Sequence, residues 1–286
     1  MMCESITCEN VIDSHGVDYI VTDGEDMLKH CPDVCNDDNY QAALGGYGAV
    51  MGAVRAQRPK VVFEACEDGG NMETFAMAAL ADTSNSCDDG PSYTTRMGAW
   101  GHTYPFSPRY AAKYAQDLPS NYTYRSAAFG GPLILMQRLS EFTAGDMATA
   151  VAAVAEYKQL RDALWADDRV AVHHLEPPLW PPSTFPPPPL MPACLSDDAT
   201  GGVGWDAIQA VSGDGRFGAA FVFRAQLGND THTLMPRGLL PSATYRVAST
   251  DGRWSPTTGT GHAIMMVGVN VSLEQAGSDV VTFTAT

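Results

Sequence analysis

The stretch VDYIVT, residues 17–22, decides the expected fold of the first half of the chain, together with the Asp23-Gly24 pair that follows it. Its β-branched and aromatic residues predict a buried strand, and the Asp-Gly pair predicts the loop at which this strand ends. A second run, KVVFE at residues 60–64, predicts another buried strand. Helical patterns follow both strands, one from Tyr40 through Val54 and one through Ala79. Strand, loop and helix repeated in this order predict a parallel α/β fold.

Another helix is predicted further along, where Thr143 and Asp146 have the spacing of a capping box. A residue pair of this kind satisfies backbone donors at the start of a helix, which therefore begins near residue 144. Its predicted apolar face follows the helical period and comprises Met147, Val151, Val154, Tyr157, Leu160 and Leu164.

The composition changes at residues 177–192, where proline is too dense for a helix or a strand ladder. An extended linker is the predicted role of this segment, with a ligand for a proline-binding domain as the alternative. Short alternating runs follow at 219–224, 244–248, 264–273 and 280–284, and they predict antiparallel strands of a small β-sandwich. The expected division is an α/β domain at 1–176, a linker at 177–196 and the sandwich at 197–286.

The composition and charge exclude several classes of protein. Apolar residues make up 45% of the chain and charged residues 17%, the balance of a folded protein. The net charge of −16 repels phosphate backbones and anionic lipids, so we expect neither a nucleic-acid nor a membrane partner, and no apolar run is long enough to cross a bilayer. A neutral sugar meets no such repulsion, although solubility alone also accounts for an acidic composition.

The cysteines and histidines do not indicate a metal site or a cofactor. Seven cysteines, an odd number without paired zinc spacing, predict neither a disulfide framework nor a zinc centre. His102, His173 and His174 are expected to serve packing or the surface. The first residues lack the basic start and apolar core of a secretory signal, which leaves the compartment undecided and predicts the cytoplasm if this start is genuine.

Two acidic positions could carry chemistry. Asp23 ends a predicted strand, and Asp88 opens the Asp88-Asp89 pair of a polar loop. In parallel α/β barrels the carboxyl ends of strands hold the chemistry, and two carboxylates at one site are what glycoside cleavage requires. The alternative is structural, because aspartate before glycine is also a common turn former.

Three motifs resemble glycoside hydrolases of the α-galactosidase (melibiase) type, family 36 and its clan relatives. DYIVTD at 18–23 is similar to the family's D-Y-I-K-W-D strand, FEACEDGG at 63–70 to its F-E-x-C-x-S-G-G-G-R segment, and SCDD at 86–89 to its T-S-D-D segment. The resemblance implies that Asp23 is the nucleophile and Asp88 the acid/base of a retaining glycosidase. It also implies that Cys66 and Gly69 line the sugar, and Gly70 and Trp100 are expected to contribute to substrate binding. The two carboxyl groups are then expected about 5 to 6 Å apart.

The chain departs from the family pattern near the expected site. Val21 replaces the family's lysine, Thr22 its tryptophan, and Asn71-Met72 the final Gly-Arg of the glycine loop. These changes leave the identity of the sugar open, so the expected partner is an oligosaccharide or α-glycoside.

The position of the first strand also differs from the family. In the family the nucleophile strand is the fourth of eight, whereas here only residues 1–16 precede it, enough for a helix at 4–14. The resemblance therefore implies the C-terminal part of a TIM-type (β/α)8 barrel, with roughly five parallel strands, followed by the sandwich. We expect either a retaining α-glycosidase that works with a separate N-terminal half or as a homo-oligomer, or a non-catalytic, carbohydrate-binding remnant of the family.

Overall fold

The computed structural model describes residues 10–23, 37–66, 73–88, 91–166, 169–179, 204–225 and 228–286, without the side chains of 37–44. Gly69, Gly70, Asp89 and the proline-rich segment beyond residue 179 lie outside the described residues. The chain forms two compact units, Met1–Asp88 and Asp89–Thr286, and each is described by itself.

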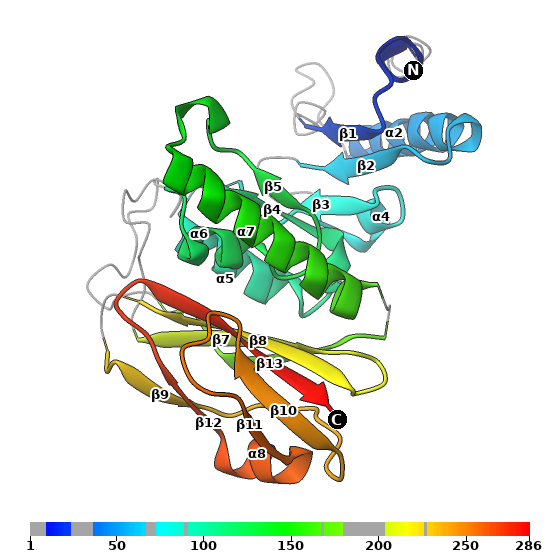
Figure 1. Cartoon of the computed structure of the whole chain (residues 1–286). Helices are drawn as coiled ribbons and strands as arrows, with labels where there is room; N and C mark the ends of the chain where they lie inside the picture. The colour runs from blue at the N-terminus through cyan, green and yellow to red at the C-terminus, as the bar shows by residue number, and fades with distance from the viewer. Residues whose placement is uncertain are drawn as a thin grey trace. The chain divides into compact units, whose positions relative to one another are not determined.

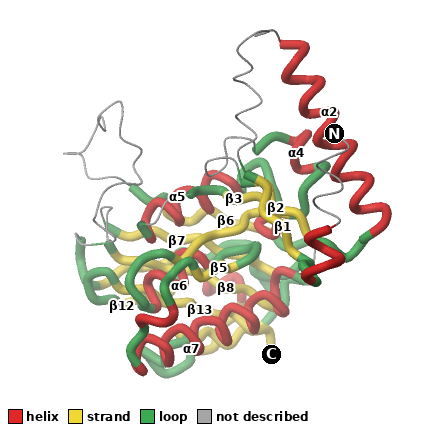
Figure 2. The backbone as a smooth tube through the Cα atoms, turned by 90° about the horizontal axis from the view of Figure 1, so that it is seen from above, coloured by secondary structure: helices red, strands yellow, loops and turns green. Residues whose placement is uncertain are grey.

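The first unit contains a parallel sheet in the order β1-β2-β3. Both strands predicted in this part of the sequence are confirmed, as β1 and β2, and the long helix α2 runs alongside them (Figure 2). Residues 10–15 are helical, so the first helix ends one residue beyond the range 4–14 predicted for it, and residues 4–9 lie outside the described residues. The elements are β1 (Tyr19–Thr22), α2 (Asp37–Gln57), β2 (Val62–Ala65), α4 (Phe75–Ala78) and β3 (Thr83–Asn85).

One face of β1 and β2 packs against α2. Ile20 and Phe63 join the helix residues Met51 and Val54 in a hydrophobic cluster. On the same face the Thr22 hydroxyl bonds with the Tyr47 hydroxyl at 2.5 Å and donates to the Glu64 carbonyl at 3.1 Å. Because side chains alternate along a strand, the neighbours of Ile20 and Thr22 project from the opposite face, which α2 leaves uncovered.

The second unit begins with two further parallel strands, β4 and β5, which pair through Lys113 and Leu133. With β1, β2 and β3 of the first unit, the described residues contain five parallel strands, in agreement with the roughly five that the family resemblance implies. The elements here are α5 (Ser92–His102), η2 (Pro108–Tyr110), β4 (Ala111–Ala115), α6 (Asn121–Ala127), β5 (Leu133–Leu135), η3 (Leu139–Glu141), α7 (Ala144–Leu160) and the π-helix η4 (Arg161–Trp165).

The capping box at the start of α7 is confirmed, since the Thr143 hydroxyl accepts from the Asp146 backbone and the Asp146 carboxylate accepts from the Thr143 backbone. The predicted apolar face is wrong in its first half, because Met147 and Val151 are exposed. Ala150 and Ala153 are buried instead. Small side chains let the helix approach its neighbours closely, and the larger apolar residues remain on the solvent side.

The rest of the second unit consists of two antiparallel sheets, a six-stranded one in the order β11-β10-β13-β8-β7-β6 and a two-stranded one of β12 and β9. Figure 1 shows α5, α6 and α7 on one side of the larger sheet. The elements are β6 (Ala171–Glu176), β7 (Trp205–Val211), β8 (Phe217–Arg224), β9 (Thr231–Leu234), β10 (Thr244–Ser249), β11 (Thr257–Thr260), α8 (Gly261–Val267), β12 (Val269–Ser272) and β13 (Gly277–Ala285).

Two details differ from the expected arrangement. The run 264–273 is not one strand, because α8 continues through Val267 and β12 begins only at Val269. The positive φ of Gly268, +82°, permits the sharp change between them. Strand β6, inside the range expected for the α/β domain, pairs antiparallel with β7 and belongs to the larger sheet.

Strand β8 is buried on both faces, which accounts for its nearly continuous apolar sequence. Ala220 and Val222 face a cluster shared with Leu234 of β9 and Val271 of β12. Phe221 and Phe223 face the opposite way, into a cluster that includes Tyr122 of α6 and Leu160 of α7. The helices and the smaller sheet therefore cover opposite sides of one central sheet.

A buried ion pair fastens α5 to this sheet. Arg96 binds both carboxylate oxygens of Asp206 on β7 through two hydrogen bonds of 2.9 Å. Its remaining donors reach the Tyr122 hydroxyl at 2.8 Å and the Ser126 hydroxyl at 3.0 Å, and the guanidinium lies 4.3 Å from the centre of the Phe223 ring. Burial opposes the charge of Arg96, but the field of Asp206 outweighs it, so the pKa of Arg96 is raised.

A second arginine fastens α6 to the sheet. Arg125 binds Glu156 of α7 through two hydrogen bonds of 2.9 Å and Asp251 of the β10–β11 turn through bonds of 2.6 and 3.0 Å. It also donates to the Ser278 carbonyl on β13 at 3.0 Å. One side chain thus joins two helices to strand β13 and the β10–β11 turn.

This arrangement predicts a pH dependence centred on Asp251. Burial raises the pKa of Asp251, but the hydrogen bonds and charge of Arg125, with Arg253, outweigh that effect and leave the pKa below its ordinary value. Because the pKa of Asp251 is lower in the folded state, the ionised carboxylate stabilises the fold at pH values above the pKa of the unfolded state, about 3.9. This stability is lost as the pH falls through the folded-state pKa. Urea titrations should show wild type more stable than Asp251→Asn at pH 6, with the difference shrinking below about pH 4.

The control for this prediction is Glu141→Gln, because Glu141 forms only an exposed pair with Arg138. Its unfolding free energy should follow that of wild type across the pH range. A difference between wild type and Asp251→Asn that stays constant from pH 3 to pH 6 would contradict the assignment.

Among the helices that the structure describes, none is both long enough and apolar enough to cross a membrane.

Candidate active site

The carboxyl ends of β1, β2 and β3 bring three polar residues to one edge of the sheet in the first unit. Asp23 follows β1, Cys66 follows β2, and Asn85 is the last residue of β3. The Cys66 amide donates to the Thr22 carbonyl at 2.8 Å, so Cys66 lies level with the end of β1. Parallel strands present their carboxyl ends on the same side, and this is the edge at which α/β barrels carry their catalytic groups.

Asp88 is attached to this edge through Asn85. The Asn85 side-chain amide donates to Asp88 Oδ1 at 2.9 Å and lies 3.7 Å from Cys66 Sγ. Cys66 Sγ lies 3.8 Å from the same Asp88 oxygen, a distance that suits a weak thiol donor. The loop between them is closed by the Cys87 amide, which donates to Asn85 Oδ1 at 3.2 Å. The structure thus brings together two residues expected at the site, Cys66 and Asp88.

Asn85 contacts Asp88 and Cys66 at the candidate site, and the sequence did not predict this role. It is fully buried, and it uses both ends of its amide to hold the loop and the Asp88 carboxylate. Its signal in the sequence is the Asn-Ser-Cys spacing, since asparagine commonly accepts from the backbone two residues further on. The spacing indicates the turn, but the contact with Cys66 depends on the pairing of β2 with β3.

The face of the sheet beneath this edge is polar. The Tyr19 hydroxyl donates to the carboxylate of Glu64, which is fully buried. Val21 alternates with Ile20 and Thr22 and therefore projects from this face, with 46% of its surface exposed. Val21 is the residue that replaces the family's lysine, and it stands on the same face as the tyrosine–glutamate pair.

Cys66 is not part of a disulfide bond. The distance between the Asp23 and Asp88 carboxyl groups stays a prediction, as do the roles of both residues. In the described part of the chain, no cluster of three or more histidine, cysteine or acidic side chains could hold a metal ion.

Trp100 lies on α5 in the second unit. Its ring packs edge-on against His174 with centroids 4.7 Å apart, and its carbonyl lies 3.1 Å from His174 Nε2. It also packs against the cluster between the helices and the larger sheet. These are packing contacts, and the substrate-stacking role expected for Trp100 stays a prediction.

The histidines are engaged in packing. His102 is buried and stacks on Tyr110, and His174 stacks on Tyr104. Burial lowers the pKa of His174, in spite of its bond to the Trp100 carbonyl, so the ring favours the neutral form.

Comparison of the whole chain with solved structures identifies the fold as that of a part of the family 36 α-galactosidases. No protein-family profile and no curated protein sequence matches the chain. The similar structures include the galactosidase domain of the α-galactosidase–sucrose kinase AgaSK, with 15% identity and a TM-score of 0.75. They also include AgaB from Geobacillus stearothermophilus, with 16% identity and a TM-score of 0.75. The α-galactosidase from Lactobacillus brevis has 17% identity and a TM-score of 0.73.

Each of these matches covers 99% of this chain but only 37% of the solved chain. The chain therefore spans little more than a third of the length of the structures it resembles. At this level of sequence identity the similarity shows the fold alone and does not show the activity of this chain.

Proposed function

We propose that the chain is part of a retaining α-glycosidase of the α-galactosidase type, which hydrolyses terminal α-linked sugars by double displacement. The observation that carries the proposal is the arrangement of Asp23, Cys66 and the Asn85–Asp88 loop at the carboxyl ends of three adjacent parallel strands. The similarity to α-galactosidases supports it. The related structures of AgaA contain 1-deoxygalactonojirimycin, raffinose or stachyose, so an α-galactoside is the first substrate class to test.

In the proposed mechanism the Asp23 carboxylate attacks the anomeric carbon while Asp88 protonates the oxygen of the departing group. The glycosidic bond breaks, and a covalent glycosyl–Asp23 ester forms. Asp88, now ionised, then removes a proton from a water molecule that displaces Asp23 and releases the sugar with its original configuration. Asn85 takes part as a positioning residue, because its amide fixes the orientation of the Asp88 carboxylate.

The remaining roles concern substrate binding. Cys66 borders Asp88, so a sugar held between the two aspartates would contact its thiol. Gly69 and Gly70 are proposed to let the backbone approach the sugar, since glycine presents no side chain. Trp100 is proposed as a further substrate contact. The proposed partners are the glycoside itself and either an N-terminal barrel half or a second copy of the chain.

A second candidate function is a non-catalytic, carbohydrate-binding relative of these enzymes. Val21 favours it, because an apolar side chain on the face that carries Asp23 cannot donate the hydrogen bonds that a lysine supplies to sugar hydroxyls. Such a protein would keep the site but not the turnover.

The test is an assay of the chain alone and of the chain co-expressed with the N-terminal barrel half of a family 36 α-galactosidase, on a panel of aryl α-glycosides. Turnover that is abolished by Asp23→Asn and by Asp88→Asn supports the enzyme. Sugar binding by calorimetry without turnover supports the second function. Absence of both turnover and sugar binding in the complemented protein contradicts both functions.

A prediction about Cys66 follows from its place beside Asp88. Cys66→Leu adds bulk where the sugar is proposed to lie, so KM or the sugar Kd should rise by about tenfold or more. The loss of unfolding free energy, read from the urea midpoint, should be smaller than the loss of binding free energy. Cys66→Ser is the matched control, because it keeps the volume and should leave binding near that of wild type. A loss of stability in Cys66→Leu without an effect on binding would assign Cys66 to packing alone.

A further inference from the structure

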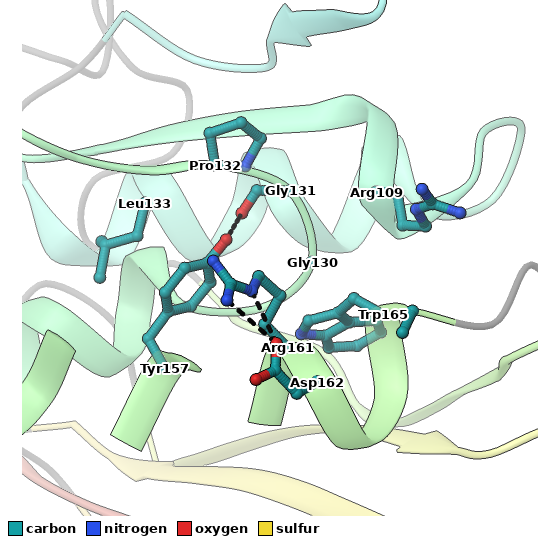
Figure 3. Close-up of a pocket in the computed structure, with 10 residues that line it drawn as sticks. Arg109, Gly130, Gly131, Pro132, Leu133, Tyr157, Arg161, Asp162 and Trp165 are labelled. Carbon is teal, nitrogen blue, oxygen red and sulfur yellow. Dashed lines mark hydrogen bonds and ion pairs between the residues drawn. The ribbon is translucent and has the colours of Figure 1, made fainter. Parts of the chain in front are cut away.

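A pocket lies in the second unit, away from the carboxyl ends of its strands. It has a volume of about 500 Å³. Arg109 of its lining precedes β4, and residues 130–133 lead into β5, so the pocket lies at the amino ends of these two strands. Its other wall is the end of α7 and the π-helix, with Tyr157, Arg161, Asp162 and Trp165 (Figure 3). The proposed glycosidase residues follow the carboxyl ends of strands, whereas this pocket lies at the amino ends of strands.

The pocket contains a buried donor that the fold leaves unsatisfied. Trp165 is 3% exposed, and its Nε1–H has no hydrogen-bond partner among the described residues. Figure 3 shows this nitrogen on the side of the ring that faces Arg161 and Asp162. A buried N–H without a partner is costly and rare in folded proteins, so its presence in a pocket indicates an acceptor supplied from outside.

Two arginines line the same pocket. They are Arg109 and Arg161, and the described lining residues also include Asp162. The Arg161–Asp162 pair has a contact of 3.0 Å but is exposed, 48% and 71% of the two side chains being accessible. Exposed pairs of this kind contribute little free energy, so Arg161 can exchange its neighbour for a ligand at small cost.

The wall opposite Arg161 is rigid. A side chain at Gly131 would meet the Ala111 carbonyl at 2.5 Å, and one at Gly130, whose φ is +108°, would meet the Pro108 carbonyl at 2.2 Å. The Tyr157 hydroxyl donates to the Gly131 carbonyl at 2.7 Å and fixes this wall to α7. The shape of the pocket is therefore set before any ligand binds, which lowers the entropic cost of binding.

We propose that this pocket binds a small oxyanion, a phosphate or carboxylate group, whose oxygens accept from Trp165 Nε1 and from the guanidinium group of Arg161. A guanidinium group matches the planar pairs of oxygens on such groups and binds them through charge-assisted hydrogen bonds. A neutral sugar would satisfy the indole but gain nothing from the charge of Arg161.

The experiment is calorimetric titration of the full chain with inorganic phosphate, acetate and neutral galactose at constant ionic strength, because screening alters any contribution from exposed charges. Phosphate should bind with a Kd of about 1 mM or below. Arg161→Gln should weaken this binding by about tenfold or more, and Trp165→Phe, which keeps an aromatic ring without the N–H, by a similar factor. Arg138→Gln, which removes an exposed arginine paired with Glu141, is the matched control and should bind as wild type does.

Acetate binding that is weakened by the same variants assigns the site to carboxylates as well as phosphates. Three results would overturn the proposal. They are no detectable phosphate or acetate binding, equal phosphate affinity in wild type and Arg161→Gln, and galactose binding at the same pocket as tightly as phosphate.

Discussion

Replacing Asp23 by alanine is expected to lower kcat/KM of the complemented enzyme for an aryl α-galactoside by about 10⁴-fold or more, because the covalent intermediate cannot form without its nucleophile. Added azide should restore part of the turnover and give a glycosyl azide of inverted configuration, since the small anion then attacks the sugar directly from the face that Asp23 has vacated.

The companion variant Asp88→Ala separates the two roles. Loss of a general acid lowers the rate of glycosidic bond cleavage by about 10²- to 10⁴-fold, and it does so most for poor leaving groups. The fall in kcat/KM should therefore be larger for a methyl than for a dinitrophenyl α-galactoside. Azide should here give a product of retained configuration, because it attacks the glycosyl–Asp23 ester. Asp214→Asn, in an exposed turn held by Ser212, is the control and should leave kcat unchanged. Identical azide products from the two variants would contradict the assignment.

Replacing Arg96 by methionine is expected to destabilise the second unit by about 3 to 5 kcal/mol, because Asp206 keeps a buried charge without its partner. For a unit of this size the melting temperature should fall by roughly 6 to 20 °C. Differential scanning calorimetry measures the shift. Loss of the contacts with Tyr122 and Phe223 acts in the same direction.

The double variant Arg96→Met with Asp206→Leu tests the cause. Apolar groups of similar volume remove both charges together, so most of the lost stability should return. Arg138→Met, at an exposed pair, should change the melting temperature little. If the double variant is less stable than the single one, the loss arises from packing around Arg96, and the ion-pair argument is wrong.

The sequence predicts the local elements whose residues carry a strong period or a cap. Strands β1 and β2 and the start of α7 follow from the 17–22 run, the 60–64 run and the Thr143–Asp146 pair. Each of these signals lies within one element. The parallel arrangement and the carboxyl-end positions of Asp23 and Cys66 follow from them by general rules of α/β proteins.

The features that depend on distant residues could not be predicted. Arg96 and Asp206 are 110 positions apart, and no local pattern indicates that they meet. The apolar run at 264–273 suits a strand, yet its first residues belong to the helix α8, because Gly268 interrupts the run and Ile264 packs into the core from the helix. Asn85 resembles an ordinary loop residue until strand pairing places it beside Cys66.

The π-helix at the end of α7 has a consequence for how this part of the chain tolerates insertions and deletions. The Ala166 amide donates to the Arg161 carbonyl, five residues back, so this turn holds one residue more than an α-helical turn. That additional residue sets the rotation at which Leu164 and Trp165 enter the core, where Trp165 meets Phe129 edge-on. Deleting one exposed residue, such as Asp162, would let the Ala166 amide reach the Arg161 carbonyl as in an ordinary α-helical turn, so the residues that follow keep their register. Inserting a residue there would instead rotate the residues that follow by about 100° and expose these side chains, so this turn tolerates a deletion better than an insertion.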